Sequence, residues 1–362
     1  MLVNRAIERW RRRDQLALRT RALRARPGRP LVIVPSILGT RIIEGGKVLW
    51  GTAPRLYRGP PVATAADAVA SGLLEGFALI PGVYAYDVFG GLLRFLDRVG
   101  GYHRGRDLFV LEYDWRRSVE HGAARLAELL DAVEHHHRGD IDVVAISTGG
   151  LLVRHCLAMG RSLRRIIYIG TPHRGSFQAI TSLHAGLQMV PLGRRFPPEE
   201  IAACETCWDA LPHPDERVVV DAAGTVLDDS LYDPATWRRM QLGSPSVAVG
   251  RHLERAARLH RVLDAAPVHG DSWVIGSRHL PTLSKLVLVN GRATVLPCTP
   301  RAADPITPHV FEPGDSSLPA RSLLGLPGLD PRRVRTVAVD DHHTLPADPA
   351  VHRHALEILL EP

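Results

Sequence analysis

The stretch IDVVAISTGGLLVRHC, residues 141–156, decides the fold. Its first six residues are mostly apolar and predict a short buried strand, and the residues after Gly149-Gly150 begin a helical pattern. Ser147 lies between them, with Ala145 two residues before it and Gly149 two residues after it. This spacing is typical of a nucleophile elbow, because only small residues fit around a sharp strand-to-helix turn. The stretch predicts a catalytic serine, and an ordinary glycine-containing turn with an uninvolved serine is the alternative.

Composition limits the class of protein. The 362 residues are enough to bury a large core, and 45% hydrophobic with 23% charged residues is typical of a globular protein. No apolar run is long enough for a transmembrane helix, and arginines at 9–13 interrupt the apolar segment that a signal peptide needs. The few cysteines suggest no disulfide framework, so we expect a cytoplasmic protein. Cys204 and Cys207 form an isolated CxxC pair, and we expect no metal and no cofactor.

Positive charge is concentrated at the N-terminus. The first 30 residues carry ten arginines against Glu8 and Asp14, a net charge of +8, whereas the whole chain has +7. We expect residues 1–29 to form a basic arm or helix that packs on the body through apolar residues including Trp10. Peripheral contact with a membrane or an acidic partner is the alternative. The nearly neutral remainder of the chain does not favour nucleic-acid binding.

Predicted strands and helices alternate along most of the chain. The predicted strands are 31–34, 108–113, 141–146, 165–170, 273–276 and 335–339, and the main predicted helices are 87–99, 118–137 and 349–360. This alternation predicts an α/β protein with a mostly parallel, doubly wound sheet covered on both faces. Asn290-Gly291 between two apolar runs predicts a β-hairpin, because both residues tolerate positive φ.

Two regions break the alternation. Residues 41–86 are rich in Gly, Pro and Ala, and we expect loops and short helices at the edge of the sheet. Residues 177–270 have helical patterns and many prolines, and we expect a mainly helical cap inserted over the sheet. The predicted domains are therefore the arm (1–29), a core in two parts (30–176 and 271–362) and the cap (177–270).

A nucleophilic serine needs a histidine base that is oriented by a carboxylate. In proteins with this type of elbow the carboxylate and then the histidine follow the serine in the chain, on loops after late strands. Asp315 stands in a tight turn, and the last predicted strand ends in Asp340-Asp341-His342-His343. Spacing predicts Asp315 as the acid and either His342 or His343 as the base.

Two backbone N–H groups are candidates for an oxyanion hole. The residue after the nucleophile supplies one donor, here Thr148, and a loop after an early strand supplies the other. The strand 31–34 runs directly into Pro35-Ser36-Ile37-Leu38-Gly39. We expect the second donor to be the N–H of Ile37, with a plain exit from the strand as the alternative.

Six segments, in order, resemble the lecithin:cholesterol acyltransferase family, which includes lysosomal phospholipase A2-like enzymes and bacterial homologues. They are LVIVPSILGTRI (31–42) for the PGxLG motif, FVLEYDWRRS (109–118) for YDWR, AISTGG (145–150) for HSMGG, YIGTPHRGS (168–176) for IGTPHxGS, GDSSLPARS (314–322) for GDGTVPxxS, and DHHTLPADPAV (341–351) for H-x-x-L. The resemblance covers most of residues 30–360 and excludes the basic arm.

The resemblance implies an α/β-hydrolase with a cap. It implies Ser147 as nucleophile, Asp315 as acid, and His342 as base, because Leu345 follows His342 by three residues. Ile37 and Thr148 correspond to the oxyanion-hole donors. Members of the family cleave an acyl ester, often of a phospholipid, and pass the acyl group to water or to an alcohol.

The chain departs from the family at several motif positions. Ser36 replaces the glycine of PGxLG, and we expect strain there if the loop requires positive φ. Ile146 replaces the histidine before the serine, and the GDGT motif reads Gly314-Asp315-Ser316-Ser317. A tailoring acyltransferase or esterase of a specialised metabolite therefore remains an alternative to a lipid hydrolase, and a catalytically silent binding scaffold is a further one.

Two tryptophans are candidates to line an acyl pocket. Trp50 lies in the early excursion, and Trp208 lies in the expected cap. Each is also suited to the hydrophobic core, and the core is the more favoured position for Trp208.

Overall fold

The computed structural model describes residues 14–24, 29–58, 67–80, 84–188, 193–266, 268–296, 300–301 and 304–362. Trp10 and most of the predicted basic arm lie outside these residues, so its expected packing stays a prediction. Residues 14–24 form a helix, with Leu18 and Ala22 buried against the body. Among the described helices, none combines the length and the apolar character that crossing a membrane requires.

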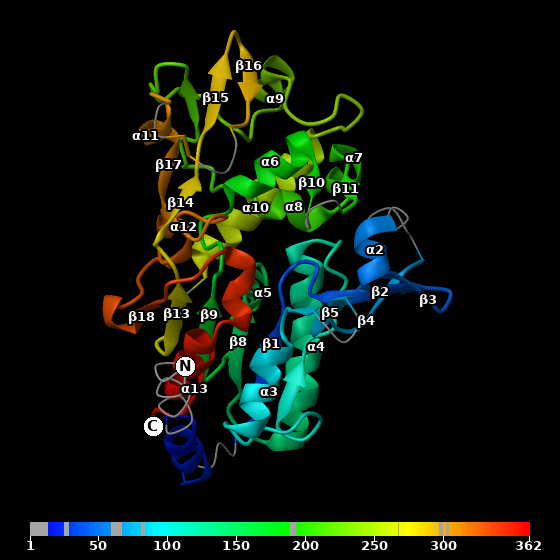
Figure 1. Cartoon of the computed structure of the whole chain (residues 1–362), viewed down its shortest axis with the longest axis vertical. Helices are drawn as coiled ribbons and strands as arrows, with labels where there is room; N and C mark the ends of the chain where they lie inside the picture. The colour runs from blue at the N-terminus through cyan, green and yellow to red at the C-terminus, as the bar shows by residue number, and fades with distance from the viewer. Residues whose placement is uncertain are drawn as a thin grey trace.

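The central sheet has six strands in the order β18-β13-β9-β8-β1-β7, and all neighbouring pairs are parallel (Figure 1). In chain order the strands are β1 (Leu31–Val34), β7 (Leu108–Val110), β8 (Asp142–Ile146), β9 (Arg165–Ile169), β13 (Ser272–Gly276) and β18 (Val334–Thr336). Every residue of β1, β8, β9 and β13 is buried. Parallel strands covered on both faces read as continuous apolar runs, which is why the sequence predicted them.

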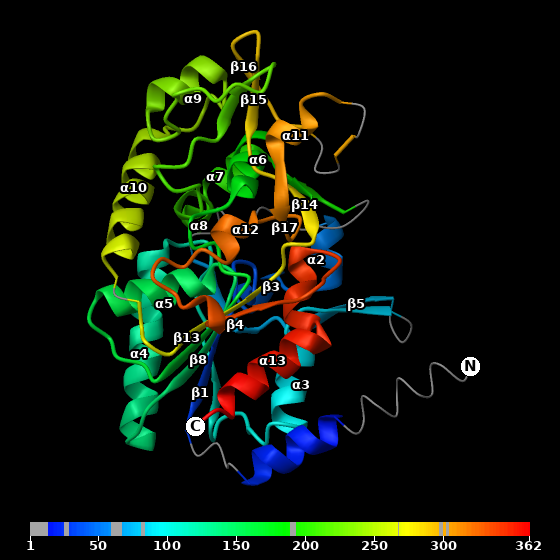
Figure 2. The same cartoon turned by 90° about the vertical axis from the view of Figure 1, so that its left-hand side faces the viewer.

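Helices cover both faces of this sheet (Figure 2). Helices α4 (Val119–His137) and α5 (Gly149–Ala158) pack on one face, where Val32, Val34 and Val143 point. Helices α3 (Gly90–Arg98) and α13 (Pro349–Leu359) pack on the other, where Leu31, Ile33 and Val144 point. Successive residues of each strand therefore enter two separate cores. The predicted fold class is confirmed.

Short sequence signals correctly placed several boundaries. Ser118 accepts a hydrogen bond from His121 N–H and caps α4, and Asp348 accepts one from Ala350 N–H and caps α13. Asn290 and Gly291 have φ of +50° and +77° and join β15 (Leu286–Val289) to β16 (Arg292–Thr294). Polar caps and positive-φ turns depend on neighbouring residues only, so the sequence reveals them.

The prediction of loops and short helices in residues 41–86 is wrong. Strands β2 (Thr40–Glu44), β3 (Lys47–Trp50) and β4 (Val69–Leu73) form an antiparallel sheet, and β5 (Gly76–Ile80) pairs with β6 (Tyr84–Asp87). Only α2 (Ala53–Arg58) is helical in this region as described. The β2–β4 pairing joins residues far apart in sequence. These half-exposed strands also lack the apolar runs of the central sheet, so no local sequence pattern predicted them.

Most of the remaining elements gather beyond one end of the sheet, and we call them the cap layer (Figures 1 and 2). They are α6 (Phe177–Ala185), β10 (Leu187–Gln188), β11 (Arg195–Phe196), α7 (Pro198–Ala202), α8 (Glu205–Asp209), β12 (Val219–Asp221), α9 (Pro234–Met240), α10 (Gly250–Ala265), β14 (Leu280–Leu283), β15, β16, α11 (Thr307–Val310) and β17 (Phe311–Gly314). The helix α12 (Ala320–Leu323) and the short helix η1 (Pro331–Arg333) lie between β17 and β18 in the chain. Strand β12 pairs with β15, so the layer draws on residues on both sides of position 270. The division of the chain at that position stays a prediction.

Substitution at the start of α5 tests how tightly this helix approaches the sheet. A Cβ at Gly149 would lie 2.5 Å from the Val34 carbonyl oxygen and 2.6 Å from that of Pro35. Backbone atoms cannot move aside as a flexible side chain does, so we expect Gly149→Ala to destabilise the protein by about 1–3 kcal/mol or more. Gly139→Ala is the matched control, because its Cβ would meet only the His137 carbonyl oxygen at 3.6 Å. Equal thermal unfolding midpoints for the two variants would contradict this packing.

Candidate active site

Ser147 occupies the sharp turn between β8 and α5. Its φ is +50°, a conformation that costs energy for any residue with a side chain. Its N–H donates to the Ile169 carbonyl at 2.8 Å, which ties the turn to the neighbouring strand β9. A Cβ at Gly150 would lie only 2.1 Å from Thr171 Oγ1, so a glycine is needed at that position too. The turn has the strained geometry that the small-residue spacing predicted.

The Ser147 hydroxyl faces a histidine from the far end of the chain. Ser147 Oγ lies 3.1 Å from His342 Nε2. His342 begins the short helix η2 (His342–Ala347), which follows the last strand of the sheet. The side chain of His342 is buried, with 8% of its surface exposed. The structure therefore brings together two side chains that are separated by 195 residues.

Asp315 completes the hydrogen-bonded series. Its Oδ2 lies 2.6 Å from His342 Nδ1, and the side chain is fully buried. Its other oxygen accepts hydrogen bonds from the N–H groups of Ser317 at 3.1 Å and Leu318 at 2.7 Å. These bonds fix the carboxylate and satisfy it away from water. With Nδ1 bonded to a carboxylate, the neutral ring carries its proton on Nδ1 and leaves Nε2 free to accept one from Ser147.

The pKa of His342 reflects this environment. Burial by itself lowers the pKa of the imidazole, but the charge of Asp315 and its hydrogen bond oppose burial, and Asp341 adds to them. The net result is a pKa above the ordinary value of 6.5. The carboxylates therefore favour the imidazolium that forms when His342 takes a proton.

The alternative base, His343, is not positioned in the same way. Its side chain is exposed, and its backbone N–H donates to Asp341 Oδ1 at 2.8 Å. Its ring packs edge-on against His342 with centroids 5.4 Å apart. No hydrogen bond among the described residues joins His343 to Ser147 or to Asp315. The geometry thus distinguishes two histidines that spacing alone could not separate.

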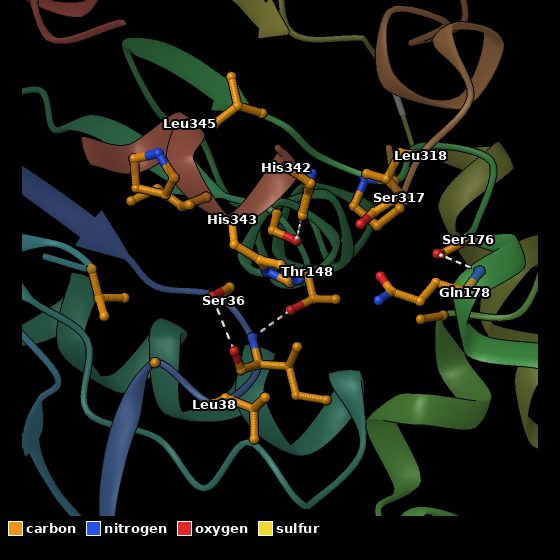
Figure 3. A pocket seen from close by; sticks show the side chains of 18 of the residues that line it. Ser36, Leu38, Thr148, Ser176, Gln178, Ser317, Leu318, His342, His343 and Leu345 are labelled. Carbon is orange, nitrogen blue, oxygen red and sulfur yellow. Dashed lines mark hydrogen bonds between the residues drawn. The ribbon is translucent and has the colours of Figure 1, made fainter. Parts of the chain in front are cut away.

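The loop after β1 is held by the side chain of Thr148. Ile37 N–H donates to Thr148 Oγ1 at 2.7 Å (Figure 3). The expected oxyanion-hole donor Ile37 is therefore already engaged within the protein. The N–H groups of Leu38 and Thr148 take part in none of the hydrogen bonds among the described residues, and both residues line the same cavity.

Strain in this loop lies at a different residue from the one expected. Leu38 has φ of +66°, whereas Ser36 is not in the left-handed region. The Trp50 indole N–H donates to the Leu38 carbonyl at 2.9 Å, and Gly39 N–H donates to the Ser36 carbonyl at 3.0 Å. A serine in place of the family glycine is thus accommodated, and the positive φ at Leu38 is held by neighbouring hydrogen bonds.

The acid loop contains a second strained residue that sequence reasoning passed over. Ser316 has φ of +80° at the position where the family motif has glycine. Its N–H donates to Thr282 Oγ1 at 3.0 Å, and its hydroxyl donates to Asp341 Oδ2 at 2.9 Å. Ser316 and Asp341 therefore join the acid loop to the base loop. The motif glycine was the signal that could have pointed to this conformation.

A cavity of about 490 Å³ opens beside Ser147 and His342, between the sheet and the cap layer. Trp50 is fully buried and lines it, and its role in binding an acyl group stays a prediction. Trp208 is not among the described residues that line this cavity, and the core was the position that the sequence favoured for it. The Trp208 indole N–H donates to the Ala202 carbonyl at 2.8 Å, and its ring stacks on His252 with centroids 4.8 Å apart. Trp208 is a core residue of the cap layer, because its indole N–H has a partner, its ring stacks on His252, and the side chain is fully buried.

No cluster suited to a metal ion is present in the described part of the chain, judged by groups of three or more His, Cys, Asp or Glu side chains. Cys204 is buried and Cys207 is partly buried, and both thiols are free. Cys207 lines the cavity. The hydrogen-bonded side chains of Ser147, His342 and Asp315 are suited to acyl transfer through a serine ester.

Comparisons with known proteins bear on the fold and on the family resemblance. The family model for lecithin:cholesterol acyltransferase matches residues 80–192. No curated protein sequence matches the chain. The solved Tle4–Tli4 complex contains a chain with TM-score 0.64 and 14% identity, over 92% of this chain and 98% of that one. The mature form of the Bacillus licheniformis lipase BlEst2 has TM-score 0.42 and 10% identity, over 92% of both chains.

The parallel sheet, the strained elbow and the similarity to a chain of the Tle4–Tli4 structure show that the protein has the α/β-hydrolase fold. The chain also resembles the lecithin:cholesterol acyltransferase family, and the family match supports this resemblance over residues 80–192, which contain three of the six sequence segments. That match supports a hydrolase or acyltransferase that acts on lipid esters.

The pKa of His342 provides a test of the electrostatics. We expect an NMR titration of its ring nitrogens to give a pKa above 6.5 in the wild type, because two carboxylates favour the charged ring. In Asp315→Asn the largest favourable contribution is lost while burial remains, so the pKa should fall below the wild-type value. A pKa that stays the same in this variant would show that Asp315 does not interact with the ring in solution.

Proposed function

We propose that the protein is a serine-dependent acyl-ester hydrolase or acyltransferase, with Ser147 as nucleophile, His342 as general base and Asp315 as the orienting carboxylate. One observation carries the proposal: the three side chains form a continuous hydrogen-bonded series at the wall of a largely apolar cavity. A serine hydroxyl is a weak nucleophile, and such a series is what activates it.

The reaction begins when Ser147 Oγ attacks the ester carbonyl carbon and its proton passes to His342 Nε2. The carbonyl oxygen becomes an oxyanion, which we propose is bound by the N–H groups of Thr148 and Leu38. Leu38 replaces Ile37 in this role because Ile37 N–H is bonded to Thr148 Oγ1. His342 then returns the proton to the departing alkoxide, and an acyl-serine remains. Water or a second alcohol attacks this ester by the same steps in reverse and releases an acid or a new ester.

The cavity supports a hydrophobic acyl group as the part of the substrate that is transferred. Trp50, Leu74, Phe77 and Phe89 line it, and the cap layer covers it from the other side. Exclusion of water by such a cover favours transfer to an alcohol over hydrolysis. A tailoring enzyme for a specialised metabolite uses the same chemistry and remains the second candidate, supported by the departures from the family motifs. A silent binding scaffold is less favoured, because it has no need of the aligned Ser147, His342 and Asp315.

The location and partners of the protein are proposals from composition. The scarcity of cysteines supports a cytoplasmic location. The basic arm supports peripheral contact with a membrane or an acidic partner, and most of it lies outside the described residues.

Covalent labelling tests the nucleophile. A fluorophosphonate probe reacts with activated serines, so we expect it to label the wild type and to leave Ser147→Ala unlabelled. Hydrolysis of p-nitrophenyl butyrate should fall by roughly 10⁴-fold or more in Ser147→Ala, as in other serine hydrolases that lose their nucleophile. Labelling that persists in Ser147→Ala would remove the assignment, and a wild type that neither reacts nor hydrolyses the ester would support the silent scaffold.

Substitution of Thr148 tests the hydroxyl that holds the oxyanion loop. Thr148→Val keeps the shape and the backbone N–H but removes the acceptor of Ile37 N–H. We expect its kcat for p-nitrophenyl butyrate to fall by about tenfold to a thousandfold, because a loosened loop misplaces an oxyanion donor. Thr148→Ser keeps the acceptor and should stay within a few-fold of wild type. Equal losses in both variants would mean that the hydroxyl does not position the loop.

A further inference from the structure

Ser316, the residue after Asp315, combines a strained backbone with a hydroxyl group that has two partners. Its φ is +80°, a conformation that glycine adopts freely and that strains a residue with a Cβ. Its N–H donates to Oγ1 of the fully buried Thr282 at 3.0 Å, which holds the backbone in this conformation. A glycine could make the same backbone contact, so the hydroxyl is the group that distinguishes Ser316 from an unstrained residue.

The hydroxyl of Ser316 contacts two consecutive residues of the base loop, which carries Asp341, His342 and His343. It donates to Asp341 Oδ2 at 2.9 Å and accepts a longer hydrogen bond from His342 N–H at 3.4 Å. The other oxygen of Asp341 accepts from His343 N–H at 2.8 Å and caps the short helix η2. One hydroxyl therefore ties the start of η2 to the acid loop.

The imidazole of His342 depends on the position of this loop. Its Nδ1 is 2.6 Å from Asp315 Oδ2, and its Nε2 is 3.1 Å from Ser147 Oγ. The hydrogen bond to Asp315 orients the ring but does not by itself fix the backbone that carries it. Because Ser316 follows Asp315 directly, the acid loop holds both the ring and the backbone of His342. A misplacement of about 1 Å can lower the rate of an enzyme about 100-fold, so even a small movement of the loop matters.

We propose that the hydroxyl of Ser316 positions His342 for catalysis, through Asp341 and through the N–H of His342 itself. This inference rests on the proposed function, because it takes His342 as the base of the reaction. The hydroxyl joins the acid loop to the base loop, which a serine at this strained position provides and a glycine does not. Without it the start of η2 moves away from the acid loop, and His342 Nε2 is no longer held at hydrogen-bonding distance from Ser147 Oγ.

Ser316 and Asp341 also line the cavity, so contact with a polar part of the substrate is the alternative role. The two roles change different kinetic constants. A positioning group acts on the geometry of the reacting atoms, so its loss lowers kcat. Loss of a group that binds substrate and transition state equally raises KM and leaves kcat unchanged.

Two variants of Ser316 separate the hydroxyl from the strain. Ser316→Ala removes the hydroxyl and keeps a Cβ at positive φ, whereas Ser316→Gly removes both. We expect both variants to hydrolyse p-nitrophenyl butyrate with kcat about tenfold or more below wild type and KM within about twofold of it. Ser316→Gly should nevertheless unfold at a higher temperature than Ser316→Ala, because glycine is free of the strain.

Arg138→Gly is the matched control for relief of strain. Arg138 has φ of +47° at the end of α4 and does not line the cavity. Glycine at this position should likewise remove strain, and kcat should stay at the wild-type value. The comparison shows that a fall of kcat in Ser316→Gly comes from the lost hydroxyl and not from a glycine at positive φ.

Variants of Asp341 test the partner of the hydroxyl. Asp341→Ala removes the acceptor, and the double variant Ser316→Ala/Asp341→Ala should lose no more kcat than Asp341→Ala alone, because both changes break the same contact. Asp341→Asn can still form a hydrogen bond with the Ser316 hydroxyl through its amide group. It should therefore lose less kcat than Asp341→Ala.

The pH profile of Asp341→Asn gives an independent readout. The titratable side chains that interact with His342 are Asp315 on the acid loop and Asp341 and His343 on its own loop. Asp341 is one of the two carboxylates that raise the pKa of His342, so this pKa should fall in Asp341→Asn. Because the base must be neutral to accept a proton, the acid limb of kcat/KM should move to lower pH.

Four results would overturn the inference while leaving the triad intact. They are wild-type kcat in Ser316→Gly, a raised KM with unchanged kcat in either Ser316 variant, additive losses in the double variant, and an unchanged acid limb in Asp341→Asn. Failure of the fluorophosphonate probe to label wild type would instead contradict the proposed function.

Discussion

The close approach of helix α5 to the ends of two strands is the constraint on which the site depends. Gly149 faces the carbonyl groups of Val34 and Pro35, and Gly150 faces Thr171, with no room for a Cβ at either position. In the turn that makes this contact, Ser147 has positive φ. The strain persists because the surrounding core over-determines it: α5 is buried along nearly its whole length. A longer side chain in the turn would relax the helix and withdraw the hydroxyl from His342.

Two further strained residues sit on the loops that complete the site. Leu38 and Ser316 both have positive φ, and hydrogen bonds from Trp50 and to Asp341 hold their loops in place. Each loop is thus fixed by a side chain from another part of the chain, and not by glycine. These hydrogen bonds between loops and core hold the loops of the site rigid. Oxyanion binding requires such rigidity, because its donors must be in place before the charge develops. The hydrogen bonds also explain how the two loops keep their conformation although Ser36 and Ser316 replace the glycines of the family motifs.

Sequence alone was sufficient for the central sheet, and it named three side chains that the structure joins by hydrogen bonds, while their catalytic roles stay a proposal. Buried parallel strands and the turn at Ser147 have local patterns, and chain order then led to Asp315. Choosing His342 over His343 required the H-x-x-L motif of the family, in which Leu345 follows three residues after the histidine. The two histidines are adjacent in the chain, and only the direction of their side chains in the folded protein distinguishes them. The sequence pointed to Ile37 and not to Leu38, the donor we propose, because the hydrogen bond that engages Ile37 N–H depends on the conformation of Thr148. The position of Trp208 depends on how the cap layer packs, and β2 pairs with a strand that is distant in the sequence. No local sequence pattern could therefore predict either feature.

The electrostatics of the site link its base to the proposed reaction. Burial lowers the pKa of His342, but Asp315 and Asp341 favour its protonated form and raise the pKa above the ordinary value. The imidazolium that forms when Ser147 gives up its proton is therefore stabilised by carboxylates that are already in place. A lower pKa would leave more of the neutral base at neutral pH but would make the ring a weaker acceptor of the serine proton. The two carboxylates thus set a balance between the amount of neutral base and its strength.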